Sequence, residues 1–65
     1  MREFKTVKVY ATKTFEVEMF RDTDTDKYRI SYKTPQNTHH YSEWISDFAT
    51  ASFLFDLKIN DLKEQ

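Results

Sequence analysis

Three stretches in the first half of the chain alternate between apolar and polar residues, which is the period of a half-buried β-strand. They lie at residues 4–11, 14–20 and 27–33, with the sequences FKTVKVYA, TFEVEMF and KYRISYK. All three contain the β-branched and aromatic residues that are enriched in strands. Short connections between successive strands favour antiparallel pairing, so the pattern predicts a three-stranded meander.

The alternation also assigns each residue to one face of the predicted sheet. The face expected to form the core carries Val7, Val9, Phe15, Val17, Met19, Tyr28, Ile30 and Tyr32. The outer face is expected to carry Phe4, Tyr10 and Phe20 among Lys8, Glu16, Glu18, Arg29 and Lys33.

Strand pairing can be tested on the charged residues of the outer face. Placing Val17 opposite Ile30 brings Glu18 beside Arg29, and opposite charges across a strand pair are favourable. In the first hairpin, placing Val17 opposite Val7 pairs Glu16 with Lys8 and Phe20 with Phe4. A shift of two residues would keep the same faces, so the alternation determines the faces rather than the register.

A change of period after Pro35 predicts a helix in the second half of the chain. Ser42 is the expected N-cap, and the helix is expected to run from about Glu43 to about Leu62. At 100° per residue, one stripe of this helix is apolar and would cover the sheet. The members of the stripe are Trp44, Phe48, Ala51, Phe55, Ile59 and Leu62.

These elements predict an α+β fold of order β-β-β-α, in which a single C-terminal helix covers one face of the meander. Residues 1–65 are expected to form a single small domain. Two questions stay open in the sequence: whether residues 34–41 add a fourth strand, and whether the helix continues past Asp56.

Composition limits how such a domain can be stabilised and what it can bind. A chain of 65 residues buries only about 60% of its unfolded surface, so its core is small. Without Cys there is neither a disulfide framework nor a thiolate metal site, and without Gly there is no glycine-rich phosphate loop. The net charge of −1 does not favour nucleic acid or an anionic membrane as a partner.

The N-terminal residues alternate in polarity and no long apolar run follows them, so neither a signal peptide nor a membrane span is expected. A cytoplasmic location is the resulting expectation.

The segment RDTDTDKY places Asp22, Asp24 and Asp26 at every second position, as calcium-binding loops do. An EF-hand loop starting at Asp22 would require Gly at its sixth position and a bidentate Glu at its twelfth. Lys27 and Lys33 occupy these positions. We therefore predict a turn in which Asp and Thr side chains bond nearby backbone, and no metal site.

Catalytic and cofactor-binding patterns find little support elsewhere in the chain. His39 and His40 are adjacent and would point to opposite faces of a strand, and two imidazoles do not complete a metal site. Serines are present without a nucleophile elbow or a glycine-shaped oxyanion hole. The sequence therefore predicts a protein that is not an enzyme and holds no cofactor.

Apolar residues outside the expected core are the more informative feature. Phe53, Leu54 and Leu57 fall on the side of the predicted helix that faces away from the sheet, where apolar groups indicate a contact surface. The alternative is a helix that breaks near Ser52 or Asp56 and buries them. Phe4, Tyr10 and Phe20 form a second candidate surface, although a Phe4–Phe20 pair could serve only to stiffen the hairpin.

Two functional hypotheses follow. The first is a non-enzymatic protein-interaction module, acting as a homodimer or as an inhibitor or adaptor of a host assembly. Small near-neutral chains without Gly or Cys are common among phage and mobile-element proteins, which favours the inhibitor role.

The second hypothesis rests on element order. The β-β-β-α order resembles the topology of AP2-type DNA-binding domains, which place a sheet face in the major groove. That resemblance implies nucleic-acid contacts by Lys8, Arg29 and Lys33. AP2 domains present arginines and tryptophans on that face and carry glycines in their turns. Here Lys8, Arg29 and Lys33 are offset by Glu16 and Glu18, and the chain has no Gly.

Overall fold

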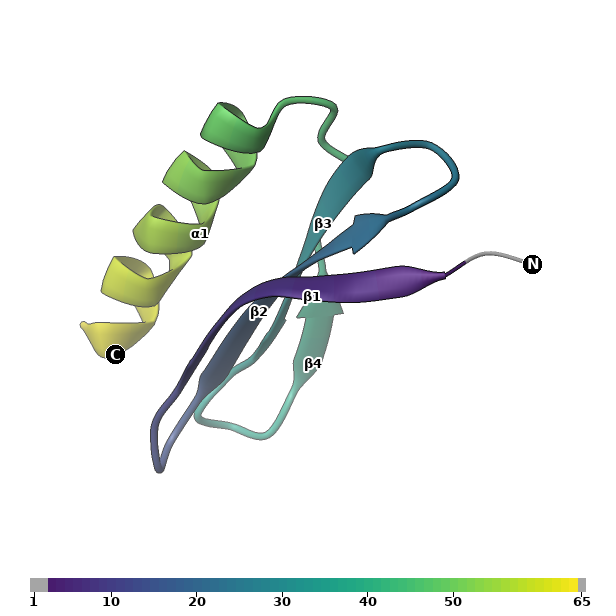
Figure 1. Ribbon diagram of the computed structural model, residues 1–65. Coiled ribbons are helices and arrows are strands. Elements are labelled where there is room, and N and C mark those ends of the chain that lie inside the picture. The colour runs from purple at the N-terminus through teal and green to yellow at the C-terminus, as the bar shows by residue number, and fades with distance from the viewer. Residues whose placement is uncertain (1–2, 65) are drawn as a thin grey trace.

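The computed structural model describes residues 3–64 and shows a four-stranded antiparallel sheet followed by one helix (Figure 1). The strands follow one another across the sheet in chain order, from β1 to β4. The elements are β1 (Phe4–Ala11), β2 (Glu16–Asp22), β3 (Lys27–Lys33), β4 (His39–Tyr41) and α1 (Phe48–Lys63). The predicted α+β meander with a C-terminal helix is confirmed, and the short β4 adds a fourth strand to it.

The β2–β3 pair keeps the predicted faces but not the predicted register. Val17 lies opposite Tyr32 and Met19 opposite Ile30, so the expected pairing of Val17 with Ile30 is wrong by two residues. A two-residue shift leaves every side chain on its face, and the buried face indeed contains Val17, Met19 and Ile30. Opposite charges still meet, because Glu16 now faces Lys33.

β2 also begins two residues later than predicted because a threonine closes the turn before it. The Thr12 hydroxyl accepts from the backbone N–H groups of Thr14 and Phe15 at 3.2 and 3.1 Å. The N–H of Thr12 donates to the Phe15 carbonyl at 2.8 Å. Phe15 thus belongs to the turn, although its ring is buried in the core as expected.

A β-bulge in β1 reverses the faces that the alternation predicts for its second half. Thr6 pairs with Phe20 but Lys8 pairs with Met19, so Val7 is an extra residue without an opposite partner. Beyond the bulge, Lys8 and Tyr10 point to the helix side and Val9 points outward, with 60% of its surface exposed. The predictions of Val7 and Val9 in the core, and of Val7 opposite Val17, are wrong for this reason.

The helix begins at Phe48 rather than at about Glu43, and its N-cap is Asp47 rather than Ser42. One carboxylate oxygen of Asp47 accepts from the backbone N–H and from the hydroxyl of Thr50, both at 2.8 Å. The bond from the Thr50 hydroxyl, and to a smaller extent the bond from the Thr50 N–H, lower the pKa of the Asp47 carboxyl below its usual value. The negative cap is therefore stabilised at neutral pH.

Ser42 is used by the sheet instead of the helix. Its N–H donates to the Ile30 carbonyl at 2.8 Å, and its hydroxyl accepts from the Ile30 N–H at 2.9 Å. Ile45 then exchanges two backbone bonds of 2.7 Å with Tyr28. Residues 42–45 thus run alongside β3, which keeps them from joining the helix.

The core lies between α1 and the inner face of β2 and β3. Its buried members are Phe15, Val17, Met19, Ile30, Ala51, Phe55, Ile59 and Leu62. The helix is continuous past Asp56, and the predicted stripe is confirmed from Ala51 onward. Trp44 lies outside the helix, and Phe48 is 45% exposed, so the first two members of the predicted stripe are wrong.

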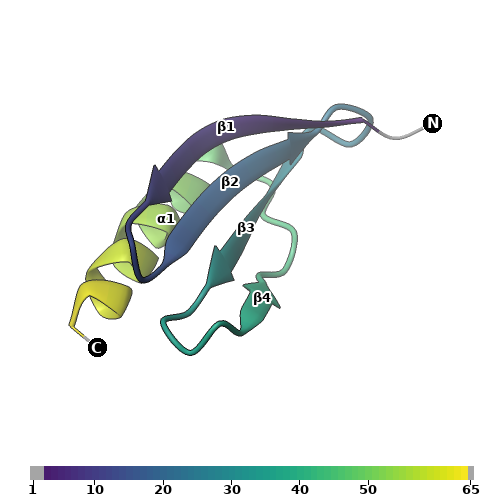
Figure 2. The ribbon, with the colours of Figure 1, turned by 90° about the horizontal axis from the view of Figure 1, so that it is seen from below.

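The helix covers only part of the sheet. It packs on β2 and β3, while β4 lies to one side of it in both views of the ribbon (Figures 1 and 2). At 16 residues, the helix found within residues 3–64 is not one that could span a membrane.

Candidate interaction surfaces

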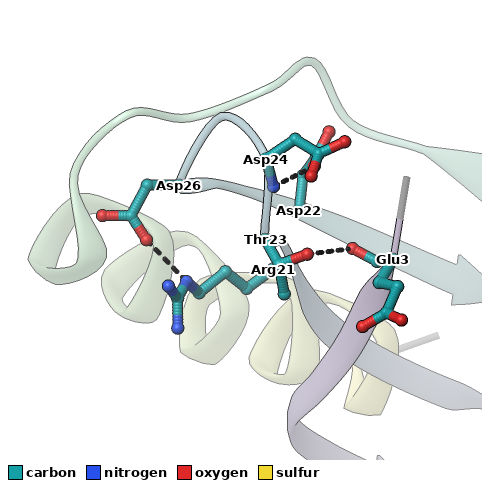
Figure 3. Close-up of polar contacts among 6 residues, drawn as sticks. All are labelled: Glu3, Arg21, Asp22, Thr23, Asp24 and Asp26. Atoms are coloured by element: carbon teal, nitrogen blue, oxygen red, sulfur yellow. Dashed lines mark hydrogen bonds and ion pairs between the residues drawn. The ribbon is translucent and has the colours of Figure 1, made fainter. Parts of the chain in front are cut away.

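The aspartate segment between β2 and β3 is a turn held by its own side chains (Figure 3). Asp22 accepts twice, from the N–H of Asp24 on its carboxylate at 2.9 Å and from the N–H of Asp26 on its carbonyl at 2.8 Å. Asp26 adopts a left-handed φ of 60°, which aspartate tolerates better than most residues. The predicted turn is confirmed.

Two further contacts tie this turn to the rest of the sheet. The guanidinium of Arg21 donates from Nε to the carboxylate of Asp26 at 2.6 Å (Figure 3). The N–H and the hydroxyl of Thr23 both donate to the carbonyl of Glu3, ahead of β1, at 3.0 and 3.2 Å. Within residues 3–64, no three His, Asp or Glu side chains gather closely enough to hold a metal ion.

The two histidines lie on the edge strand β4 and point to opposite faces. His40 pairs with Tyr32 and its ring stacks on that tyrosine at 5.1 Å. His39 stacks on Tyr41 at 6.0 Å. Each imidazole therefore packs on an aromatic ring of its own face of the edge strand.

An aromatic cluster, made of Phe4, Phe20 and Trp44, covers one end of the outer sheet face. The Phe4 and Phe20 rings meet edge to face at 5.6 Å, so the predicted pair is in contact. Trp44 stacks on Phe4 at 5.9 Å and meets Phe20 edge-on at 6.1 Å. The sequence pattern missed Trp44 here, because its helical spacing to Phe48 and Phe55 concealed its position in the connecting segment.

Arg29 holds this aromatic cluster to the chain that follows β4. Its guanidinium lies 4.6 Å from the Trp44 ring and 5.8 Å from the Tyr41 ring. Its Nε also donates to the carbonyl of Ser42 at 2.8 Å. A guanidinium can lie over an aromatic ring and donate a directed Nε hydrogen bond at the same time, a combination that lysine does not provide.

Two residues expected on the outer face lie on the helix side, as a consequence of the bulge. Lys8 donates from Nζ to the Ser52 hydroxyl at 2.7 Å. Tyr10 stacks on Phe15 at 6.0 Å and packs against the core. The proposed nucleic-acid contacts are thereby divided: Arg29 and Lys33 lie on the outer face, whereas Lys8 does not.

The side of α1 that faces away from the sheet carries two exposed apolar residues. Phe53 exposes 64% and Leu57 exposes 52% of its surface. They are one helical turn apart and form a single apolar patch. Leu54, which was expected beside them, is half-buried against the core, so its placement on the far side is wrong.

Next to this patch, an open groove of about 630 Å³ lies between α1 and the strands β3 and β4. Its apolar and aromatic lining is Ile30, Tyr32, Tyr41, Leu54 and Leu57, and the charged residues Lys58, Asp61 and Glu64 lie along the helical wall. The groove exists because a helix about 10 Å wide covers only about two strands spaced about 4.8 Å apart. Because one helix cannot cover four strands, the groove would have been predictable from the sequence if β4 had been recognised there.

Comparisons with protein-family models, with curated proteins and with solved structures find no match to this chain. The resemblance to AP2-type domains therefore rests on the order of the elements alone, to which the structure adds β4.

Proposed function

We propose that this protein is a non-enzymatic protein-interaction module that docks through the exposed side of α1 and the adjoining groove. In this role it acts as an adaptor or inhibitor by occupying the surface of another protein chain. The observation that carries the proposal is the apolar pair Phe53 and Leu57, exposed by 64% and 52% beside an apolar groove. Exposed apolar surface adjoining a concave apolar site is typical of contact surfaces.

The chemistry of the groove supports binding rather than catalysis. Its charged wall residues are Lys58, Asp61 and Glu64, of which Lys58 and Asp61 lie 3.7 Å apart and form an ion pair. Lys58 also lies 4.4 Å from the ring of Tyr32 on the groove floor. These charged groups thus make contacts within the protein, at the rim of an apolar surface. An apolar centre with a polar rim is typical of a docking site.

The test compares the wild type with the double variant Phe53→Asp, Leu57→Asp. Both side chains are exposed, so the variant should fold, with an unchanged far-UV circular dichroism spectrum. We expect the wild type to form a stoichiometric complex with a protein chain, either a second copy or a partner co-purified from the native host. Light scattering on the purified samples should show that the variant has lost it.

A matched control adds the same two charges elsewhere. Gln36→Asp together with Thr25→Asp changes exposed residues in the β3–β4 and β2–β3 connections, outside the patch and the groove. The control should keep the complex. A complex that survives in the patch variant, or one that the control loses equally, would refute the proposal.

A second candidate function is nucleic-acid binding by the outer sheet face. One observation favours it: Arg29 and Lys33 share that face with Tyr41, a 62% exposed residue with an aromatic ring of the kind that stacks on bases. This hypothesis predicts retention on heparin at low salt that falls steeply as salt rises and weakens in the Lys33→Ala variant. Absence of retention at low ionic strength would exclude it.

A further inference from the structure

We infer that the free edge of β1 binds an extended segment of another protein, which pairs with it as an added strand and carries acidic residues at alternate positions. The acidic side chains of that segment point into a cleft between β1 and α1. This surface is separate from the patch of Phe53 and Leu57, so it adds a second contact to the proposed function and does not depend on it. With two such surfaces, the protein can join two chains.

Part of the β1 backbone points away from the sheet. β1 is the end strand in the order β1 to β4 and runs along one side of the molecule (Figure 2). The N–H of Thr12 donates to the carbonyl of Phe15, so the alternation of an antiparallel ladder makes Tyr10 the next residue hydrogen-bonded to β2. The N–H and C=O groups of Val9 and Ala11 therefore point to the free edge, where a further strand can pair with them.

An open cleft lies beneath this edge, because the helix packs on β2 and β3 rather than on β1. The cleft has a volume of about 590 Å³ and is lined by residues 8–10 of the strand, with Phe55 and Ile59 among its helical residues. Successive side chains of a strand point to opposite faces. Every second side chain of a strand added to β1 thus points into space that the protein itself leaves open.

Lysines outnumber carboxylates in this cleft. Its charged residues are Lys8, Lys63 and Asp56. The Lys8 ammonium donates to the Ser52 hydroxyl at 2.7 Å, which leaves two of its three donors for other acceptors. The Lys63 ammonium lies 5.2 Å from the centre of the Tyr10 ring. Within residues 3–64 neither lysine forms an ion pair, so the carboxylates of an added strand can pair with both.

The charges of β1 favour an acidic strand over a second copy of β1. Lysines and bulges are devices by which edge strands avoid pairing with one another. The bulge lies at Val7 and leaves residues 8–11 in regular pairing with β2. Lys5 and Lys8 are the charged residues of β1, so two copies of this strand would bring lysines together, whereas an acidic strand is attracted.

The other face of the edge defines the remaining positions of the added segment. Val9 points away from the helix and is 60% exposed. An apolar or β-branched residue on the added strand would cover it. The matching segment therefore alternates acidic residues, which face the cleft, with residues such as valine, which face the outer side.

The first experiment titrates isotope-labelled protein with a peptide of alternating Glu and Val, about six residues long, which is the usual length of a strand. We expect a dissociation constant of about 1 mM or tighter, with the largest amide shifts at Val9 and Ala11. The same peptide with Lys in place of Glu should not bind. Absence of binding by the Glu peptide, or equal binding of both peptides, would overturn the inference.

The second experiment removes one outward-pointing donor. Proline is tolerated in an edge strand where its nitrogen faces solvent, so Val9→Pro should keep the far-UV circular dichroism spectrum of the wild type. It should bind the Glu peptide at least about tenfold more weakly. Unchanged affinity in the folded variant would show that the edge does not pair with the peptide.

A third variant tests the charge of the cleft without changing the strand. Lys63→Glu should weaken the Glu peptide by about tenfold and allow the Lys peptide to bind. The matched control is Gln36→Asp with Thr25→Asp, which changes the net charge by the same amount at exposed residues outside the cleft. The control should bind like the wild type, and equal weakening there would overturn the role of the cleft.

Two further outcomes separate this surface from the α1 surface. The variant Phe53→Asp, Leu57→Asp should bind the Glu peptide like the wild type, and its failure to do so would place the peptide on α1 and overturn strand addition while the proposed function stands. A wild-type dimer that Val9→Pro abolishes would overturn the acidic partner, because a second copy would then occupy the edge.

Discussion

Two surfaces of this protein carry apolar residues outside the core, and they differ in how far the chain itself covers them. On the outer sheet face, Trp44 packs on Phe4 and Phe20 and is in turn held by Arg29. Phe20 and Trp44 are half-buried there, whereas the outermost ring, Phe4, is still 52% exposed. On α1, Phe53 and Leu57 remain more than half exposed. An excess of aromatic residues is thus not by itself the mark of a partner, because a connecting segment far along the chain can supply the cover.

The largest difference between the two surfaces should appear in monomer stability. Trp44→Ala removes the ring that covers the outer face, and we expect the free energy of unfolding to fall by about 2 kcal/mol, less than the ~3–5 kcal/mol for a fully buried aromatic residue. Phe53→Ala should change it by no more than about 0.5 kcal/mol. Urea unfolding at a protein concentration low enough to keep the chain monomeric measures both. Equal losses would show that the surfaces are covered alike.

A smaller effect is expected from the residue that fastens the aromatic cluster. Arg29→Lys keeps the charge but loses the planar stacking on Trp44 and the Nε bond to Ser42, so stability should fall by about 1 kcal/mol. Lys27→Arg, at an exposed position of the same strand, is the control and should be neutral. If Arg29→Lys is neutral too, the cover over the outer face is held by ring contacts alone.

The smallest expected effect on stability concerns Asp47. This residue is the N-cap of α1, where the connecting segment that carries Trp44 ends and the helix that carries Phe53 and Leu57 begins. Because folding lowers the pKa of its carboxyl, the cap contributes stability above the ordinary pKa of aspartate and loses it as the pH falls through the folded-state pKa. Asp47→Asn keeps a capping side chain that does not titrate. The variant should melt a few degrees lower at pH 7 and match the wild type in acid.

Thermal melting from pH 7 to pH 2 provides this comparison. A difference between the two proteins that stays constant across the range would show that the Asp47 carboxylate does not supply the charge-dependent part of helix stability.

The fold was largely predictable where one local pattern acts alone. In β2 and β3 the alternation placed Val17, Met19 and Ile30 on the buried face, and a register error of two residues left those faces unchanged. In α1 the spacing of Phe55 and Ile59 gave the core stripe correctly. In each case the side chain's direction follows from backbone geometry within a few residues.

The candidate site was predicted only in part. The exposure of Phe53 and Leu57 followed from the helical period, but the groove beside them depends on β4. That strand has three residues, too few for a period to be recognised, and its pairing with β3 becomes visible only in three dimensions.

The sequence by itself determined the meander, its two faces in β2 and β3, and the apolar stripe of the helix. Only the tertiary structure decided the bulge at Val7, the start of the helix and the position of Trp44. The physical reason is that at each of these places two local conformations have similar free energies, so contacts with residues far along the chain decide between them. Ser42 and Asp47 are both good caps, and the bonds of Ser42 to Ile30, twelve residues away, decide which of them begins the helix.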